Sequence, residues 1–355
     1  MILAFGDLNS PLIAPRIELL SEIDEVIAVA NANCREISNV PFSVKKSPCC
    51  KNLTLRYILN TLYTFYLLLK CRPKLVAIHW ASRRFQTLAF LPFAKRTIVS
   101  CMGGDIDKEQ DFRGSKAFWI RLLLKNAALI TVKSQFMKNM ILENIPEIEE
   151  SKIKIISWGV SERFLDAIPD IEVERFLDGT YGFLSIRALR EFYRINEILE
   201  VFLDFKEESG ANAKLIIATF AADKEYAARV KLKAENSRFK EDILFLEIPQ
   251  NRLPSVLKSI NTVISYSSAD GLPQSVMEAL AAQRPVIASD LGNYAELLNS
   301  SNSILCANNR SLKMAFARAL EGGFNFEGEN ELLDKKIQSK RYIELCRSLV
   351  KETHV

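Results

Sequence analysis

Short apolar runs alternate with longer amphipathic stretches along the whole chain. In the first half the apolar runs lie at 2–5, 25–30, 74–79, 97–101, 129–132 and 152–156. In the second half they lie at 181–186, 213–218, 243–247, 262–266, 285–289 and 303–306. Runs of this length are typical of strands that are buried on both faces. Stretches with helical spacing lie between them, as at 53–71, 115–127 and 134–145, and again at about 330–350.

This alternation predicts an α/β fold built from two Rossmann-like domains, each a doubly wound parallel sheet. The boundary is expected within 162–182, a charged segment that contains one proline and two glycines. We therefore assign residues 1–170 to an N-terminal domain and 171–330 to a C-terminal domain. The last segment, 331–355, is expected to form a helix that packs back on the N-terminal domain. Ligands of such sheets bind beyond the carboxyl ends of the strands, so the sequence predicts a ligand cleft between the domains.

Composition narrows the class of protein. The chain has 355 residues, of which 48% are hydrophobic, and a net charge of +4, which is too small to predict nucleic-acid binding. It has two histidines and no CxxC pair, so we expect no metal site. The seven cysteines show no spacing pattern and predict reduced thiols in a cytoplasmic protein. The chain start does not resemble a signal peptide, and the most apolar run is shorter than the roughly 20 residues that span a membrane.

The segment SADGLPQSVMEALAAQRPVIASD, residues 268–290, carries the strongest indication of function. A buried strand is followed by a loop with Asp270 and then by a helix that contains Glu278. Ser275 and Glu278 have the spacing of a capping box, which predicts that Ser275 caps this helix. A capped helix after an Asp-Gly turn accounts for the pattern without any function. In the functional interpretation, the free amides of 274–276 bind phosphate and the two carboxylates bind sugar hydroxyls.

Continued to residue 298, this segment resembles the signature of family 4 glycosyltransferases, the retaining enzymes of the GT-B fold. Asp270 and Glu278 have the spacing of the family's E-x7-E pair, and Pro285–Ser289, Gly292 and Glu296 fall in register. The segment 185–202 is similar to the one that opens the family's nucleotide-binding domain. Weaker similarity covers 5–11, 101–106, 129–136 and 152–164 in the first half.

The resemblance implies a UDP- or GDP-sugar as the donor, without a cofactor or a metal. The catalytic residues would be Arg187 on the diphosphate, Asp270 beside the transferred sugar and Glu278 on the ribose. Arginine suits this role because its planar fork donates two hydrogen bonds to phosphate oxygens. The alternative for Arg187 is a surface ion pair, and its place at a strand end favours phosphate. The other donor contacts would come from Asn9, Ser10, Arg190, Leu272, Pro273, Gln274 and Ser275. For Asn9 and Ser10 a simple turn is an alternative.

Several positions depart from the family's pattern. The first acid is Asp270 where the family has a longer glutamate, and Gln283 stands where a glycine is usual. The family's lysine after Arg187 is absent, and Arg190 is preferred over Arg194 as its substitute. The glycine-rich turn expected after strand 213–218 is also missing.

Acceptor-side residues are expected in the first domain. Met102 stands where many relatives have a histidine in a His-Gly-x-Asp block, so Gly104 and Asp105 are the local candidates together with Met102 itself. His79, at the end of strand 74–79, is a further candidate. A single histidine at such a position is more often structural.

The region 45–96 is basic and rich in aromatic residues. It contains eleven lysines and arginines and no acidic residue. Such a surface attracts anionic lipid headgroups, so we expect contact with an anionic membrane surface. The alternative is a solvated basic face over a packed helix, and no motif supports nucleic acid.

The expected function is transfer of a sugar, with retained configuration, to a sugar hydroxyl of a glycan or lipid-linked acceptor. The protein would act in cell-surface polysaccharide synthesis, in the cytoplasm or on the inner face of the cell membrane. Two alternatives stay open at this point: a GT-B nucleotide-sugar epimerase, and a non-catalytic nucleotide-sugar-binding or scaffolding subunit with a decayed site.

Overall fold

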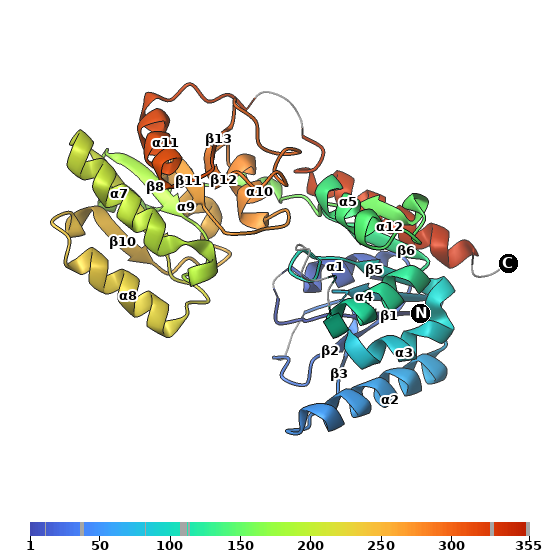
Figure 1. Ribbon diagram of the computed structural model, residues 1–355. Coiled ribbons are helices and arrows are strands. Elements are labelled where there is room, and N and C mark those ends of the chain that lie inside the picture. Colours follow the sequence, from blue (N-terminus) through green and yellow to red (C-terminus); the bar gives the residue numbers. More distant parts are fainter. Residues whose placement is uncertain are drawn as a thin grey trace. The chain divides into compact units, whose positions relative to one another are not determined.

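The computed structural model describes residues 1–10, 12–35, 39–81, 83–106, 112, 114–326 and 330–352. The chain divides into two compact units, shown in Figure 1. The first unit is Met1–Trp158 with Lys336–Val355, and the second is Gly159–Lys335. The division therefore follows Trp158, whereas the sequence placed the boundary after residue 170.

The first unit contains a seven-stranded parallel sheet. In spatial order the strands are β3 (Ser43–Lys46), β2 (Val26–Ala30), β1 (Ile2–Phe5), β4 (Leu75–His79), β5 (Thr97–Ser100), β6 (Leu129–Val132) and β7 (Ile153–Ile155). Side chains alternate between the two faces, as a strand requires. In β1, Leu3 and Phe5 belong to the core on one face, and Ile2 and Ala4 belong to the core on the other.

Helices cover both faces of this sheet. One face is covered by α2 (Leu53–Cys71), α3 (Thr87–Phe90), α4 (Gly114–Asn126) and α5 (Gln135–Asn144). The other face is covered by α1 (Ala14–Glu18) and by α12 (Lys335–Glu352). The C-terminal helix thus belongs to the first unit: Tyr342 is fully buried there, and the side chain of Gln338 accepts a 3.1 Å hydrogen bond from the amide of Ser157. Short 3-10 helices complete the unit: η1 (Leu19–Glu22), η2 (Arg84–Gln86), η3 (Leu91–Arg96) and η5 (Glu150–Lys152).

The second unit contains a six-stranded parallel sheet. Its spatial order is β10 (Ile243–Leu246), β9 (Ala213–Ala218), β8 (Tyr181–Ser185), β11 (Thr262–Ser265), β12 (Val286–Ser289) and β13 (Ser303–Cys306). One face packs against α7 (Ile195–Ser209), α8 (Lys224–Glu235) and α11 (Asn309–Glu321). The other packs against α6 (Ile171–Leu177), α9 (Leu253–Ser259) and α10 (Gln274–Ala281). Its 3-10 helices are η6 (Glu162–Phe164), η7 (Glu191–Tyr193) and η8 (Lys240–Asp242).

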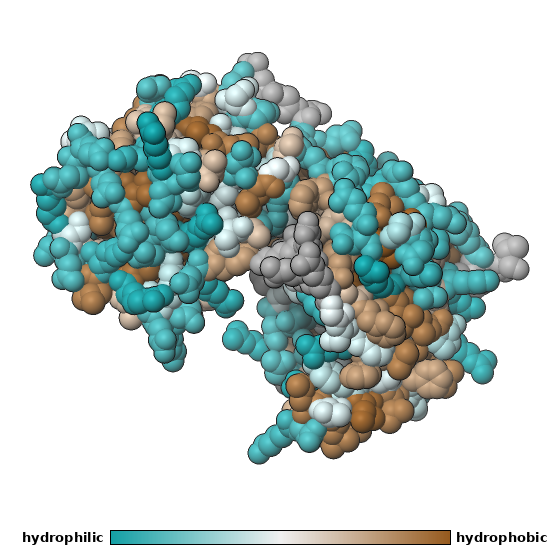
Figure 2. Space-filling model, viewed as in Figure 1, coloured by the Kyte–Doolittle hydropathy of each residue, from teal (hydrophilic) through white to brown (hydrophobic). Residues whose placement is uncertain are grey.

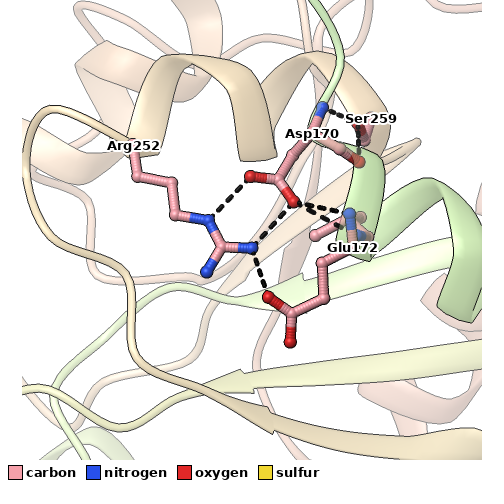
Figure 3. Close-up of polar contacts among 5 residues, drawn as sticks. Asp170, Glu172, Arg252 and Ser259 are labelled. Atoms are coloured by element: carbon pink, nitrogen blue, oxygen red, sulfur yellow. Dashed lines mark hydrogen bonds and ion pairs between the residues drawn. The ribbon is translucent and has the colours of Figure 1, made fainter.

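The charged segment 162–182, expected to link the domains, is folded into the second unit. Asp170 caps α6, because its side chain accepts hydrogen bonds from the amides of Glu172 and Val173. The same carboxylate receives both arms of the Arg252 guanidinium, at 2.7 and 2.8 Å, and Arg252 also pairs with Glu172 (Figure 3). The pKa of the Asp170 carboxyl is lowered mainly by its hydrogen bond with Arg252. The charges of this segment therefore hold α6 against the start of α9.

The predicted fold class is confirmed, since both units are doubly wound parallel sheets. Each of the twelve strands expected from apolar runs is present, and the ends differ by at most one residue. One strand, β3, was not predicted. It is a mostly exposed edge strand with two lysines, so it lacks the apolar run by which the others are recognised.

Candidate functional site

Arg187 and Asp270 meet beyond the carboxyl ends of two neighbouring strands of the second unit. Arg187 follows β8 and Asp270 follows β11, which pairs with β8. Nη2 of Arg187 lies 2.8 Å from Oδ2 of Asp270, and Nη1 donates a 2.9 Å hydrogen bond to Oγ of Ser275. The guanidinium also lies over the ring of Tyr193, 4.5 Å from its centre. Arg187 is thus held by an acid, a hydroxyl and an aromatic face.

The loop that contains Asp270 is fixed by hydrogen bonds from β12 and the loop after it. Oγ of Ser289 donates to the carbonyl of Ser267 at 2.7 Å, and Oγ of Ser267 donates to the Asp270 carboxylate at 3.2 Å. Nδ2 of Asn293 donates to the carbonyl of Gly271 at 3.0 Å and also bonds that of Asp270. These bonds hold the backbone on either side of the Asp-Gly turn.

Helix α10 begins differently from the prediction. Its N-cap residue is Pro273, and Ser275 is the second residue of the helix, so the predicted capping box is wrong. The proline fixes φ at −73° and has no side chain that could accept a bond from the helix. The hydroxyl of Ser275 is used by Arg187 instead. The amide of Val276 donates to the carbonyl of Pro273, whereas the amides of Gln274 and Ser275 have no hydrogen-bond acceptor among the described residues.

Glu278 lies one turn into α10 and is 5% exposed. Its Oε1 accepts a 2.9 Å hydrogen bond from Nε2 of Gln250, in the loop after β10. Gln250 was not among the predicted site residues, and only its place after a predicted strand could have indicated it.

The remaining donor-binding candidates of this unit differ in what they could offer to a ligand. Leu272 is 1% exposed and belongs to the core, so it offers a ligand only its main chain. Pro273 is buried, and the side chain of Gln274 donates to the carbonyl of Gly159 at 3.1 Å. Asn293 and Tyr193 join the site without having been predicted.

Arg190 lies apart from Arg187. Its Nε donates to the carbonyl of Ala221 at 2.7 Å, and its side chain is exposed. It lines an open depression of about 600 Å³, whose other charged residues are Glu191, Asp223, Glu225 and Arg229. Carboxylates outnumber guanidinium groups there, which disfavours a phosphate. Arg194 lies over the ring of Tyr266, 5.4 Å from its centre.

In the first unit, Asn9 and Ser10 form a turn that is closed on itself. The amide of Asn9 donates to the side chain of Asp7 at 3.1 Å, and the amide of Ser10 donates to the carbonyl of Asp7 at 3.0 Å. Oδ1 of Asn9 accepts a bond from the amide of Arg35. Both residues follow β1 at its carboxyl end, where the prediction placed them.

Asp105 holds the loop in which Met102 and Gly104 lie. Its fully buried carboxylate accepts hydrogen bonds from the amides of Ala81, Met102 and Gly103, at 2.6, 2.9 and 3.1 Å. Burial raises its pKa to about 6, against the effect of these bonds. Gly104 is exposed at this loop, and Sδ of Met102 accepts a bond from Arg16 at 3.0 Å. Asp105 therefore shapes the loop from inside, and Gly104 is its accessible part.

His79 is buried at the end of β4, with 1% of its surface exposed. Neither ring nitrogen has a hydrogen-bond partner among the described residues. Its ring lies 6.1 Å from that of Trp158 and 6.5 Å from that of Tyr342. Burial, reinforced by the charges of Arg16 and Arg83, lowers its pKa to about 3. The imidazole is neutral and structural in this setting.

The chain resembles known glycosyltransferases in sequence and in fold. Residues 169–337 match the family described as "Glycosyl transferases group 1". The chain is 23% identical over 235 residues to YtcC of Bacillus subtilis (strain 168), which is named as a glycosyltransferase. That match covers 62% of this chain and 56% of YtcC, so the chain spans about half the length of this relative.

Many solved structures resemble the whole chain, and two of them illustrate the similarity. HepE from Anabaena, solved in complex with UDP, has a TM-score of 0.74 at 14% identity, and the match covers 99% of this chain and 98% of HepE. An alpha,alpha-trehalose-phosphate synthase (UDP-forming) from Burkholderia vietnamiensis has a TM-score of 0.77 at 10% identity, with 100% and 98% coverage. Identities this low show the fold alone. The chain therefore has the GT-B fold, and its residues 169–337, just under half of its length, match the model of the group 1 glycosyl transferases.

Proposed function

We propose that this protein transfers a sugar from a nucleotide diphosphate sugar to a sugar hydroxyl of a glycan or lipid-linked acceptor, with retained configuration at the anomeric carbon. The proposal is carried by one observation: the guanidinium of Arg187 lies beside the start of α10, between Asp270 and Ser275. An arginine fork and helix-start amides are the groups that hold a diphosphate. HepE, a structural relative, was solved with UDP, which supports a UDP-sugar as the donor and leaves GDP-sugars to be compared.

Each residue has a separate role in this proposal. Arg187 and the amides of Gln274 and Ser275 neutralise the charge that develops on the departing diphosphate. Glu278 binds the ribose with its carboxylate, and Gln250 orients it. Asp270 contacts the transferred sugar from the loop. Positioning and electrostatic stabilisation are then the protein's main contributions to the rate.

The transfer itself would proceed on one face of the sugar. The bond between the anomeric carbon and the diphosphate oxygen breaks, and the diphosphate leaves with the electron pair. The acceptor hydroxyl oxygen forms the new bond on the same face, and its proton passes to the leaving phosphate oxygen. Because the leaving group accepts this proton, the reaction requires no basic side chain at the position of Met102 and none from the buried His79. We place the reaction in polysaccharide synthesis at the cytoplasmic side of the cell membrane.

Donor binding tests the assignment. Isothermal titration with UDP, GDP and their glucose conjugates is expected to show binding to the parent protein. Arg187→Lys is expected to weaken it about tenfold or more, because a lysine keeps the charge and loses the fork. Glu278→Gln is expected to weaken binding of the same ligands, and Arg318→Lys on α11 is the matched control. Equal affinity of all variants would show that this pocket does not bind the donor.

Turnover separates transfer from the alternatives. A transferase releases nucleotide diphosphate in proportion to glycosylated acceptor, and NMR of the product reports the anomeric configuration. An epimerase converts the donor sugar without an acceptor. A non-catalytic subunit binds the donor and produces neither change, and either result would replace the proposed reaction.

A further inference from the structure

Helix α2 presents apolar side chains on both of its faces. Leu67 and Leu68 are buried in the core on one face of the sheet. On the opposite side, a second apolar stripe recurs at spacings of three and four residues, which places its members on one face of a helix. These side chains are 39% to 60% exposed: Leu55, Ile58, Leu62, Phe65, Tyr66 and Leu69.

The apolar surface continues beyond α2. Both α2 and α4 pack against η2 and α3, and each of these neighbours adds an exposed apolar side chain: Phe85 from η2, Leu88 from α3 and Phe118 from α4. Figure 2 shows apolar residues gathered on this part of the first unit. Contiguous exposed apolar surface of this kind marks an interaction site in a folded protein.

The charge around this stripe has a single sign. Lys51 and Arg56 lie at the start of α2, and Lys70 and Arg72 lie at its end, all exposed. No carboxylate of the described chain forms an ion pair with any of the four. The sequence from 45 to 96 contains no acidic residue that could pair with them locally.

We propose that this surface, the exposed stripe of α2 with its four flanking basic residues, docks on an anionic lipid bilayer. A helix with an apolar outer face and basic flanks lies in the interface plane, with its apolar side chains among the acyl chains and its cations at the headgroups. Among the described residues, no helix is long and apolar enough to cross a membrane. The four flanking residues are all basic, and none has an ion-pair partner in the part of the chain that the structure describes, which favours a surface of anionic lipid over a protein partner of mixed charge.

This inference goes beyond the transfer reaction, because lipid binding can be measured without donor or acceptor. It also gives a physical reason for an acceptor that is held in a membrane. Each basic residue near the surface raises the affinity for an anionic membrane about fivefold. The burial of the six apolar side chains of the stripe raises it further.

Flotation with extruded vesicles tests the proposal on the full chain. The parent protein is expected to float with phosphatidylcholine vesicles that contain phosphatidylglycerol, and a smaller fraction should float with vesicles of phosphatidylcholine alone. Raised ionic strength should lower the fraction that floats with the phosphatidylglycerol vesicles, because salt screens the charges. Ile58→Asp combined with Leu62→Asp is expected to abolish flotation. Leu232→Asp combined with Met314→Asp, at exposed apolar positions of α8 and α11, is the matched control and is expected to float like the parent.

A second pair of variants tests the charges. Lys51→Gln with Arg56→Gln is expected to weaken binding to the anionic vesicles about 25-fold, from two residues at about fivefold each. Lys340→Gln with Lys351→Gln on α12, which covers the opposite face of the sheet, is expected to leave binding unchanged. All four double variants are expected to bind the donor like the parent, which keeps this test separate from that of the donor site.

Three results would overturn the proposal. The parent protein could fail to float with anionic vesicles, or the Ile58 and Leu62 variant could float as well as the parent. Sedimentation velocity could show that the parent self-associates without lipid and that the same variant is monomeric, which would make this face an interface between copies of the chain.

Discussion

Arg187 and Asp270 form an ion pair of 2.8 Å in which the two side chains are only 12% and 13% exposed. Removing one partner takes the opposite charge away from a side chain that is nearly buried, and the remaining hydrogen bonds are to neutral groups. We therefore expect Arg187→Ala and Asp270→Ala each to lower the free energy of unfolding by about 3 kcal/mol, the lower end for a buried pair. The double variant should lose much less than the sum of the two, because no uncompensated charge remains.

Urea denaturation of the four proteins measures this coupling. The exposed pair of Arg318 and Glu321, 3.1 Å apart on α11, is the control, and its coupling should be about 0.5 kcal/mol or less. Additive effects of Arg187→Ala and Asp270→Ala would mean that solvent already screens the pair. The coupling also matters for donor binding, because a diphosphate that binds the Arg187 guanidinium must compete with Asp270 for it.

Gly159 is the first residue of the second unit, and it packs against Asp334 and Lys335 at the end of that unit. It has φ of +60°, and a Cβ on it would lie 2.4 Å from backbone atoms of Lys335. The neighbouring Val160 and Asp334 form an isolated β-bridge. Gly159→Ala should therefore separate these two segments and cost about 3 kcal/mol or more, since backbone atoms cannot move aside as a flexible side chain can.

Gly210 provides the matched control for this substitution. It has φ of +64°, and a Cβ there would meet no atom within 4 Å. Gly210→Ala should therefore cost only about 1 kcal/mol, the strain of the left-handed conformation alone. Thermal unfolding of both variants separates steric overlap from backbone strain, and equal losses would show that no overlap exists at Gly159.

The pattern of apolar runs predicted every strand of both sheets except the exposed edge strand β3, because a strand buried on two faces needs a continuous apolar run and an exposed edge strand does not. It did not predict how α10 begins. Ser275 and Glu278 satisfy the capping-box spacing, yet Pro273 takes the cap position and frees the Ser275 hydroxyl for Arg187. This outcome depends on the position of Arg187 after β8, which the fold brings close to the start of α10. The local sequence around Ser275 cannot predict that position.

Two other features show the same limit. Gln283, noted in the sequence for replacing a glycine, has φ of +55°, which explains why glycine suits the position. Gln250, the hydrogen-bond partner of Glu278, is 28 residues away in sequence and reaches it only through the fold. The domain boundary was misplaced because the charges of 162–182 look solvated in sequence, whereas Arg252 pairs with two of them.

His79 should make the stability depend on pH in one direction. Its pKa is about 3 in the folded protein and near 6.5 when unfolded, so the unfolded chain binds the proton more readily between these values. Its contribution is therefore fully present above pH 6.5 and is lost as the pH falls, by about 1.4 kcal/mol for each pH unit. His79→Leu removes this dependence and breaks no hydrogen bond to a described residue. The check is the difference in urea-unfolding free energy between variant and parent, followed below pH 6.5. A constant difference would contradict the low pKa.

Asp105 should act in the opposite direction. Burial raises its pKa from 3.8 to about 6, so the folded protein binds the proton more readily than the unfolded chain in this range. Its contribution to stability is then greatest below pH 4 and falls as the pH rises through 6, by about 3 kcal/mol in all at about 1.4 kcal/mol for each pH unit. Asp105→Asn keeps an acceptor for some of the three amides and cannot titrate. The hydrogen bonds that the Asn variant loses change its free energy of unfolding by an amount that does not depend on pH. The quantity to measure is therefore the slope, against pH, of the difference in unfolding free energy between the variant and the parent. Relative to the parent, the variant should gain stability from pH 4 to pH 7. If the variant instead loses stability relative to the parent from pH 4 to pH 7, the hydrogen bonds from the amides of Ala81, Met102 and Gly103 outweigh burial and keep the carboxylate charged.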